Sequence, residues 1–236
     1  MTTHPPGNIR DIYGIGAKKA TELRKYYNIR TIYDLRKYIR KIPDIITPPQ
    51  RTGLKYYAKI SRRIPYAEAL KHATFLTKHL PHVTIAGSLR RGESKIGDID
   101  AIITAPLAPA IATLTSLGYI ISTLASGDEK FSGIARLPGT TNYRRLDLIR
   151  TTREEKPFAL LYFTGDFVQN ISMRQHAKKQ GLTLSQHGLK HARTGRPIPN
   201  LKTERDIFAA LSLDYKPPSH RIHEGREKQT LSALSA

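Results

Sequence analysis

The chain has 236 residues, of which 39% are hydrophobic, so it is long enough to bury a core and has the composition of a globular protein. It contains no cysteine, which excludes a disulfide scaffold and a zinc site built on thiolates. Its 39 Lys and Arg against 19 Asp and Glu give a net charge of +20, which favours a polyanion as partner, most commonly nucleic acid. Charge alone leaves open a ribosomal or chromatin-type protein and a cationic membrane binder.

The first 60 residues are predicted to form a basic helical subdomain. Apolar residues recur at spacings of three and four over residues 17–27 and again over residues 32–39, which predicts two helices. Pro43 and the Pro48-Pro49 pair are predicted to close this block. The segment from Met1 to Gly7 has no apolar run, so no secretory signal is expected.

A glycine hairpin stands before the first of these helices, in the sequence Tyr13-Gly14-Ile15-Gly16. The two glycines make a tight turn that exposes backbone N–H groups at a helix start, and Lys18 and Lys19 follow them. Such N–H groups with nearby cations form a phosphate-binding site. The alternative interpretation is a plain glycine turn.

Residues 61–151 are predicted to form a mixed α and β subdomain. A helix is expected after Pro65, and Pro81 stops it. The pattern then changes to short runs of β-branched and apolar residues, which predicts strands over 83–86, 99–104 and 145–150 and a helix over 110–117.

A phosphate-binding segment is predicted at Gly87-Ser88-Leu89-Arg90-Arg91-Gly92. Gly-Ser at the start of a turn or helix offers N–H groups and a hydroxyl to phosphate, and the two arginines add charged contacts. Gly97 allows a close approach of the backbone. The segment thus indicates where a triphosphate would bind.

The most informative tripeptide is Asp98-Ile99-Asp100. Residues two apart in a strand point to the same face, so the two carboxylates would lie side by side while Ile99 enters the core. Two like charges so close are costly unless a cation lies between them, and Mg²⁺ prefers such oxygen ligands. A phosphate site followed by a carboxylate pair is what nucleotidyl transfer requires. Taken alone, the tripeptide also fits a solvated strand edge.

Asp147 is the candidate for a third carboxylate. It is an isolated acid in the apolar strand pattern of Arg145 to Arg150. Placed beside the first two, it would complete a site for divalent metal. The alternative is a salt bridge with a neighbouring arginine.

Residues 152–218 are predicted to form a third subdomain, with a helix over 166–180, a strand pair near 182–189 and a helix over 203–211 that Thr203 caps. The polar residues 219–236 are expected to be a disordered tail. The longest apolar stretch, residues 99–121, is broken by prolines and polar residues, so no membrane span is expected.

Together these motifs resemble the active site of the family-X DNA polymerases of the polymerase beta type. The pattern is Gly-Ser-x-Arg-Arg-Gly, then Gly-Asp-x-Asp, then Arg-Arg-x-Asp on a later strand. The resemblance covers residues 8–221 and includes Arg62-Arg63-Ile64-Pro65, Tyr162-Phe163-Thr164-Gly165 and Thr203-Glu204-Arg205-Asp206. It implies an α+β fold, with a nucleotidyltransferase palm, a helix-hairpin-helix subdomain before it and a mixed α/β nucleotide-binding subdomain after it.

The resemblance also implies residue roles. Asp98 and Asp100 resemble ligands of both metals, and Asp147 resembles the third ligand of the catalytic metal, placed to help deprotonate the primer 3′-hydroxyl. Mg²⁺ is the implied cofactor, for which Mn²⁺ can substitute. The other residues implied in nucleotide binding are Arg63, Gly87, Ser88, Arg91, Gly97, Tyr162, Phe163, Gly165, Phe167 and Asn170. Those implied in DNA binding are Gly14, Gly16, Ala17, Lys18, Lys19, Lys130, Arg145, Arg174 and His187.

Two of these groups have a more specific implied role. Tyr162 and Phe163 resemble the pair that packs against the sugar and excludes a 2′-hydroxyl; without the resemblance they would be interpreted as a core aromatic pair. The glycine hairpin resembles one that grips the backbone of one DNA strand without reading its sequence. The carbonyl groups of Arg10, Ile12 and Ile15 would there bind Na⁺ or K⁺.

The implied function is that of a DNA-directed DNA polymerase that fills short gaps in DNA repair, including base excision repair. Its implied partners are primer-template or gapped DNA and dNTP, and it is expected to be a monomer that acts in the nucleus, the cytoplasm or a virion. The alternatives are a template-independent nucleotidyltransferase and a non-catalytic DNA-binding protein. The Tyr162-Phe163 pair resembles that of template-directed members, and clustered carboxylates have no use on a surface that only binds DNA.

The sequence departs from the polymerase beta pattern in two places. It begins at the second hairpin of that pattern, so no deoxyribose-phosphate lyase activity and weak recognition of the 5′-phosphate of a gap are expected, and the compact size suggests a viral origin. Phe167 stands where polymerase beta has an aspartate in the nucleotide pocket. Selectivity for the base or the sugar is therefore expected to differ.

Overall fold

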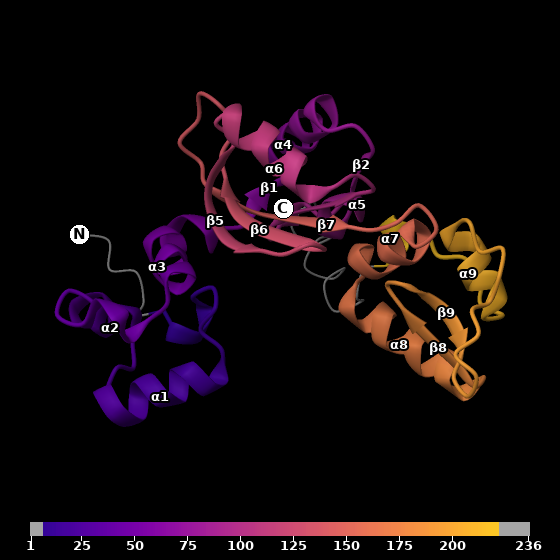
Figure 1. The fold of residues 1–236 in the computed structure, drawn as a ribbon, viewed down its shortest axis with the longest axis horizontal. Coiled ribbons are helices and arrows are strands. Elements are labelled where there is room, and N and C mark those ends of the chain that lie inside the picture. Colours follow the sequence, from indigo (N-terminus) through magenta and orange to yellow (C-terminus); the bar gives the residue numbers. More distant parts are fainter. Residues whose placement is uncertain (1–6, 222–236) are drawn as a thin grey trace, which may run out of the picture.

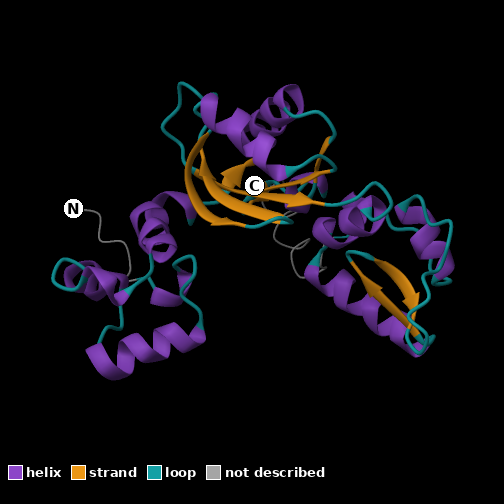
Figure 2. Ribbon diagram, in the orientation of Figure 1, coloured by secondary structure: helices purple, strands orange, loops and turns teal. Residues whose placement is uncertain are grey.

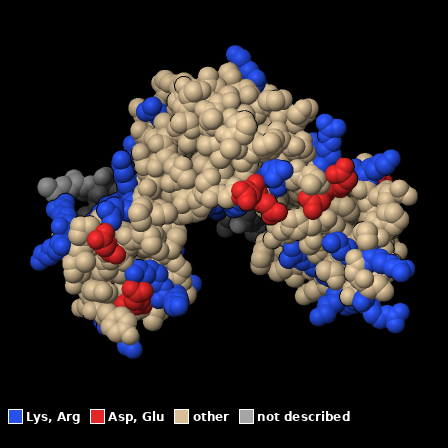
Figure 3. Space-filling model, viewed as in Figure 1, with Lys and Arg blue, Asp and Glu red and all other residues tan. Residues whose placement is uncertain are grey.

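The computed structural model describes residues 7–221, which form three bodies in chain order (Figure 1). A helical amino-terminal body and a carboxy-terminal body both hang from the same side of a central body that is built on a sheet (Figure 2). The space-filling view shows an opening between the two outer bodies (Figure 3). The α+β class predicted from the sequence is confirmed.

The amino-terminal body is built from η1 (Ile9–Asp11), α1 (Ala17–Tyr27), α2 (Ile32–Tyr38), η2 (Pro43–Ile45) and α3 (Pro48–Ile60). The two predicted helices, α1 and α2, are confirmed. Their apolar stripes meet α3 in a separate core that contains Leu23, Leu35 and Leu54. The hydrophobic period of each helix therefore fixes which face is buried.

The prediction that the Pro48-Pro49 pair closes this block is wrong, because the pair begins α3. Proline is tolerated in the first turn of a helix, where its missing N–H would have no acceptor within the helix. Thr47 and Gln50 form a capping box across this turn. The Gln50 Nε2 also donates to the carbonyl of Gly14 at 2.7 Å, which ties α3 to the glycine hairpin.

The central body holds a five-stranded sheet in the order β2-β4-β7-β6-β5, in which β4 and β7 are parallel and the other neighbours are antiparallel. Its strands are β2 (Val83–Ile85), β4 (Ile99–Ile103), β5 (Ile120–Ser126), β6 (Lys130–Ala135) and β7 (Arg144–Arg150). A separate pair joins β1 (Ile64–Pro65) to β3 (Lys95–Ile96). The predicted strands correspond to β2, β4 and β7.

Strands β5 and β6 lie where the sequence predicts no strand. Small and polar residues such as Ser122 and Gly133 interrupt the alternation that marks a half-buried strand. Packing requires the glycine, because a Cβ at position 133 would lie 2.6 Å from the ring of Phe131. The tertiary contact therefore outweighs the low strand propensity of glycine.

Helices α4 (Tyr66–His79) and α6 (Leu107–Ser116) cover one face of the sheet, the upper face in Figure 2. They bury a core that includes Ile99 and Ala101 of β4. Because successive side chains of a strand alternate between faces, Asp100 lies on the other face, which turns toward the opening. The sheet thus separates the core from the carboxylates.

A buried histidine in the core gives the fold a defined pH dependence. His72 of α4 is 1% exposed, and its Nδ1 lies 2.8 Å from the hydroxyl of Tyr119. Burial lowers the pKa of His72 from 6.5 to about 4, because the imidazolium would lose its hydration. As the pH falls from 6.5 toward 4, the unfolded chain takes up this proton first, so stability decreases over that window.

We expect His72 to lower the free energy of unfolding by about 2 kcal/mol between pH 6.5 and pH 5, which denaturant titrations at the two pH values measure. His72→Asn, whose amide can still form a hydrogen bond with the Tyr119 hydroxyl, should lose less unfolding free energy between the two pH values than the wild type does. His82→Asn, at an exposed histidine, should behave as the wild type does. An equal loss in His72→Asn and the wild type would contradict this assignment.

The carboxy-terminal body consists of α7 (Lys156–Thr164), α8 (Phe167–Lys179), the hairpin β8 (Leu182–Ser185) and β9 (Gly188–His191), α9 (Glu204–Ala210) and η3 (Pro218–His220). The predicted helices α8 and α9 and the predicted hairpin are confirmed, as is the Thr203 cap. Helix α7 was not predicted. It is apolar over most of its surface because it packs on two cores, through Ala159 against the sheet and through Leu161 within this body.

The sequence predicts a disordered tail over residues 219–236, and this predicted boundary lies too early in the chain. Residues 222–236 lie outside the described part of the chain, but Arg221 belongs to the carboxy-terminal body. It is 1% exposed, its Nη1 donates to Glu204 Oε1 at 2.7 Å, and its Nε donates to the carbonyl of Lys216 at 2.8 Å. A polar composition could not indicate that one of its charges is buried and paired. Among residues 7–221, no helix is long and apolar enough to cross a membrane.

Candidate active site

Three carboxylates meet where β4 and β7 lie side by side. The parallel register pairs Asp100 with Asp147, and Asp98 directly precedes β4. One oxygen of each of the three lies within 4.8 Å of the other two. The structure therefore brings together the three acids singled out in the sequence, and the side chain of Ile99 between the first two is fully buried.

Two cations neutralise part of the negative charge of this cluster, one at Asp147 and one at Asp98. Lys130 Nζ lies 2.8 Å from Asp147 Oδ2, and Arg145 is ion-paired with Asp98. Burial, together with the nearby charge of Asp147, raises the pKa of Asp100 from 3.8 to about 7. A divalent cation among the three carboxylates would remove this repulsion, and hard oxygen ligands suit Mg²⁺ and Mn²⁺. The residues present therefore fit a metal site.

Ser132 of β6 holds Asp147 in place. Its Oγ donates to Asp147 Oδ1 at 2.7 Å, and the serine is 2% exposed. The antiparallel register between β6 and β7 sets these two residues opposite each other. Sequence reasoning missed Ser132 because it did not predict β6, and no motif marks the residue.

Gly87 brings the backbone against the carboxylates. It opens the short helix α5 (Gly87–Arg90) with a φ of +62°, a conformation that side chains strongly disfavour. A Cβ at this position would lie 2.1 Å from Asp100 Oδ2. Glycine is therefore required both by the backbone conformation and by the close approach to Asp100.

The two arginines after this glycine point in different directions. Arg90 Nη2 donates to Glu204 Oε2 and its Nη1 to Thr164 Oγ1, both at 2.6 Å, so Arg90 joins α5 to the carboxy-terminal body. The prediction that Arg90 contacts phosphate is therefore wrong. Arg91 does reach the site, where it bonds Glu93 and the carbonyl of Thr164.

A cavity of about 600 Å³ opens beside the carboxylates, between the central and carboxy-terminal bodies. This volume is typical of a site for a small molecule. All twelve residues predicted to bind nucleotide line it: Arg63, Gly87, Ser88, Arg91, Gly97, Asp98, Asp100, Tyr162, Phe163, Gly165, Phe167 and Asn170. Glu93, Asp166 and Val168 line it too and were not predicted. No motif in the sequence signals them.

An aromatic pair forms one wall of the cavity. The rings of Tyr162 and Phe163 are 4.9 Å apart and nearly perpendicular, and both residues are half-buried. Asn170 Nδ2 donates to the carbonyl of Tyr162 at 2.7 Å, and the guanidinium of Arg174 lies 4.7 Å from the centre of the Tyr162 ring. These contacts fix the wall, so the pair is not merely part of a core.

Phe167 stands at the rim of the cavity, where it is the first residue of α8. It is 76% exposed, which is unusual for a phenylalanine, and Val168 beside it is 46% exposed. Exposed apolar residues at the mouth of a cavity indicate a ligand that covers them.

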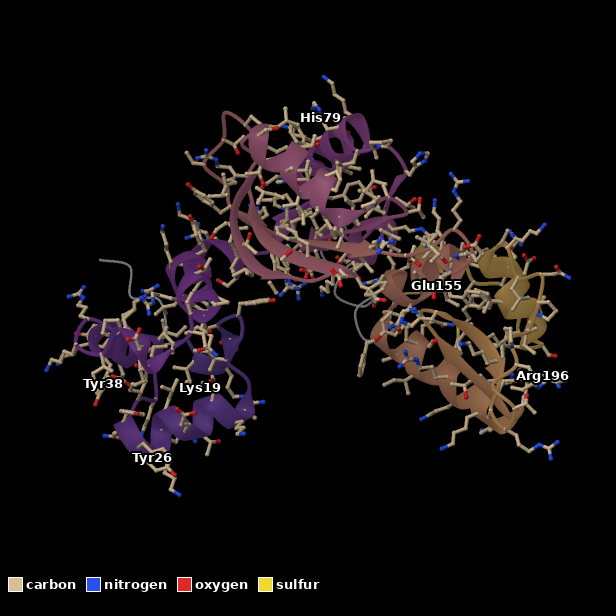
Figure 4. All side chains as sticks on the ribbon, in the orientation of Figure 1. Lys19, Tyr26, Tyr38, His79, Glu155 and Arg196 are labelled. Carbon is tan, nitrogen blue, oxygen red and sulfur yellow. The ribbon has the colours of Figure 1, made fainter. Side chains whose placement is uncertain are left out.

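The glycine hairpin offers backbone groups to the opening. Gly14 has a φ of +80°, and Gly16 caps α1 without a side-chain hydrogen bond. Ala17 and Lys18 of the first turn are exposed. Lys19, labelled in Figure 4, instead pairs with Glu22 at 2.6 Å, so part of its charge is neutralised within the helix.

The three carbonyl groups predicted to bind a monovalent cation lie in and before this hairpin. The carbonyl of Ile12 accepts the N–H of Ile15 at 3.0 Å. A carbonyl oxygen has a second lone pair, so this bond leaves it able to face a cation together with the carbonyls of Arg10 and Ile15.

A second cavity, of about 390 Å³, lies between the hairpin and the carboxylates. Tyr13 and Tyr57 line it from the amino-terminal body and Arg145 from the central body. Arg63, Gly97 and Asp98 line both cavities, so the two are contiguous. Lys130 and Arg145, both predicted to bind DNA, flank the carboxylates with 52% and 38% of their side chains exposed.

His187 lies apart from the carboxylates. It lines a third hollow, of about 390 Å³, within the carboxy-terminal body. Its Nδ1 lies 3.1 Å from Oε1 of Glu155, which stands near the junction with the central body (Figure 4). The structure therefore does not bring His187 to either of the other cavities, and its contact with DNA stays a prediction.

Three family models match the chain in succession. Residues 8–61 match the fingers domain of DNA polymerase lambda, residues 63–153 the palm of DNA polymerase beta and residues 159–222 the thumb of DNA polymerase beta. The three matches correspond to the amino-terminal, central and carboxy-terminal bodies.

Individual proteins similar to this chain are also DNA polymerases by name. DNA polymerase lambda of Rattus norvegicus is 33% identical over 89% of this chain and 41% of the relative, and the DNA polymerase/3′-5′ exonuclease PolX of Bacillus subtilis is 30% identical over 93% of this chain and 40% of the relative. The chain thus spans about two fifths of the length of these relatives. The polymerase beta of Leishmania infantum in a ternary gap complex has a TM-score of 0.83 at 28% identity, over 92% of this chain and 89% of that one. Its ternary P/T complex gives a TM-score of 0.81 at 29% identity, over 92% and 97%.

Proposed function

Because the chain belongs to the family-X DNA polymerases, the family of polymerases beta and lambda, we propose that it is a DNA-directed DNA polymerase that fills short gaps during DNA repair. The observation that carries this proposal is the meeting of three carboxylates with a cavity that all twelve predicted nucleotide-binding residues line. Gapped or primer-template DNA and dNTP are the substrates. The acting form in this proposal is a monomer.

Asp98, Asp100 and Asp147 hold Mg²⁺, for which Mn²⁺ can substitute. The bound metal supplies positive charge to the primer hydroxyl and to the transferring phosphate. Both oxygens of Asp147 accept hydrogen bonds, Oδ1 from Ser132 and Oδ2 from Lys130, so its orientation is fixed, and the carboxylate helps to deprotonate the primer 3′-hydroxyl. Arg145 contacts the primer near its 3′ end, and Lys130 contacts the minor groove of the DNA.

The triphosphate lies between α5 and the carboxylates, where Ser88, Arg91 and Arg63 face the cavity and Gly97 leaves room for it. The sugar packs against Tyr162 and Phe163. The backbone carbonyl of Tyr162, which accepts from Asn170 Nδ2, is the group that excludes a 2′-hydroxyl. The base lies toward Phe167, whose exposed ring replaces a polar contact with a stacking surface.

The glycine hairpin binds the backbone of one strand through its N–H groups, with Lys18 as a charged contact and Na⁺ or K⁺ at the carbonyls. Arg174 follows the template from α8. The net charge of +20 adds attraction that does not depend on sequence.

Asp147→Ala tests the proposal against its two alternatives. We expect it to abolish primer extension on gapped DNA while DNA affinity is kept or rises, because a negative charge facing phosphates is removed. Extension that survives in Asp147→Ala would contradict the site assignment. If the wild-type protein binds DNA but extends no primer, the result supports a non-catalytic DNA-binding protein. If extension does not depend on the template base, the result supports a template-independent nucleotidyltransferase.

The hydrogen bond from Ser132 gives a graded prediction. We expect Ser132→Ala to lower kcat by about 10- to 100-fold, the range found for residues that orient metal ligands, with little change in KM for dNTP. Ser132→Thr keeps the hydroxyl and should retain most of the activity. Single-nucleotide incorporation measures both variants. Equal losses in the two would mean that side-chain volume at this position matters and the hydrogen bond does not.

A further inference from the structure

A long segment of the carboxy-terminal body carries no acidic residue. Residues 167–203, from the start of α8 to the cap of α9, contain seven Lys and Arg and neither Asp nor Glu. The cavity takes up only the beginning of this segment, through Phe167, Val168 and Asn170. Most of its positive charge therefore has no role in the site described above.

The fold gathers five of these cations at the end of the body far from the cavity. Helix α8 has 13 residues, so its last turn lies about 20 Å along the helix from Phe167. The N–H of Ala192 donates to the carbonyl of Gly181 at 2.8 Å, which holds the loop after β9 beside the end of α8. The exposed cations brought together there are Lys178, Lys179, Lys190, Arg193 and Arg196, which we call the distal basic surface.

No carboxylate neutralises the distal basic surface. None of its five side chains has a salt bridge within residues 7–221. The lower part of the carboxy-terminal body shows blue side chains and no red ones in Figure 3. Arg196 stands at the outer edge of the body, on the side away from the amino-terminal body (Figure 4). The surface therefore runs from α8 around the end of the body to its outer side.

We propose that the distal basic surface binds the unpaired 5′ extension of the template strand. This inference rests on the proposed function, which supplies a template. Five unpaired cations match a phosphodiester chain. The face of α8 that leads to them carries exposed Phe167 and Ile171 and then Arg174, and single-strand sites mix apolar and cationic side chains in this way because the bases are free to stack.

The curvature of the surface selects a single strand over a duplex. Duplex DNA has a persistence length of about 150 base pairs, so it stays nearly straight over the size of this protein. A duplex in the opening would therefore touch only the side of the carboxy-terminal body that faces the opening. A single strand is flexible enough to follow the surface from α8 to Arg196. The affinity for DNA should therefore increase with the length of the unpaired template.

The test compares the Kd for primer-template DNA without a downstream strand, in which the 5′ template overhang has about 2 or about 12 nucleotides. We expect the longer overhang to tighten wild-type binding at least about 5-fold, and Arg193→Ala/Arg196→Ala to remove most of that gain. For the longer overhang, the slope of log K against log salt should fall by about 1.4 in the double variant, because each single-strand phosphate that a cation neutralises contributes about 0.7. Incorporation on the short overhang should not change, because neither arginine lines the cavity.

Lys71→Ala/Lys78→Ala is the matched control, since it removes two exposed cations from α4 on the far face of the sheet. The inference is overturned if Arg193→Ala/Arg196→Ala keeps the gain, if the control loses as much, or if annealing a complement to the overhang leaves the gain intact. If the wild-type protein extends no primer but the gain still depends on the two arginines, the proposed function fails and binding of a single strand stands.

Discussion

Asp100→Asn is expected to abolish nucleotide incorporation and to make the metal-free protein more stable above pH 7. Asp100 is one of the three clustered carboxylates, so the substitution removes a negatively charged metal ligand, and we expect kcat to fall by about 1000-fold or more. The amide keeps the size of the side chain. The loss of activity should therefore come without a loss of fold.

The gain in stability follows from the pKa of Asp100, which burial and the charge of Asp147 raise from 3.8 to about 7. The folded state binds this proton more tightly than the unfolded chain does, so stability falls as the pH rises from 3.8 through 7. Above pH 7 the ionised carboxylate of Asp100 lowers the free energy of unfolding by on the order of a few kcal/mol. The neutral amide of asparagine does not have this cost. Thermal unfolding in EDTA at pH 8 measures the difference.

Asp128→Asn is the control for this pair of effects, because Asp128 is an exposed acid in the turn between β5 and β6. It should leave both activity and melting temperature near those of the wild type. If Asp100→Asn kept its activity, or melted lower than the wild type at pH 8, the carboxylate would not be the repelled metal ligand described here.

Gly87→Ala is expected to inactivate the protein without unfolding it. A Cβ at position 87 would lie 2.1 Å from Asp100 Oδ2, so the carboxylate or helix α5 must move. A displacement of about 1 Å in a catalytic group can cost 100-fold in rate, and we expect at least that loss in kcat. The positive φ of 62° adds about 1 kcal/mol of backbone strain.

Gly92→Ala separates the clash from the strain. Gly92 also has a positive φ, of 77°, but a Cβ there would meet no atom within 4 Å. In denaturant titrations Gly92→Ala should lose only the stability that the backbone strain costs, and only Gly87→Ala should lose most of its single-turnover incorporation rate. Similar rates in the two variants would show that α5 can shift without disturbing Asp100.

The parts of the site that depend on local sequence could be predicted. The strand alternation at Asp98-Ile99-Asp100 is local, and so are the turn at Gly87 and the cap at Thr203. Each needs only the period of a strand or the conformational freedom of one residue. The parallel pairing of Asp100 with Asp147 needed more, and the resemblance to family X provided it.

The parts that were missed depend on partners distant in the chain. Arg90 could be expected to bind phosphate until the fold placed Glu204 at 2.6 Å from it, and nothing near either residue signals that pair. Ser132 meets Asp147 only through the register of β6, a strand whose small and polar residues conceal it. Pro48 and Pro49 were interpreted as breakers because their role at the first turn of α3 depends on the Thr47 cap.

The measurement that tests the central claim most directly is incorporation opposite each of the four template bases in a one-nucleotide gap, with each dNTP supplied singly and Mg²⁺ present. A metal-dependent polymerase that reads its template should add the complementary nucleotide fastest at every template base, and EDTA should stop the reaction. Incorporation at rates that do not depend on the template base would contradict the claim, as would the absence of incorporation with both Mg²⁺ and Mn²⁺.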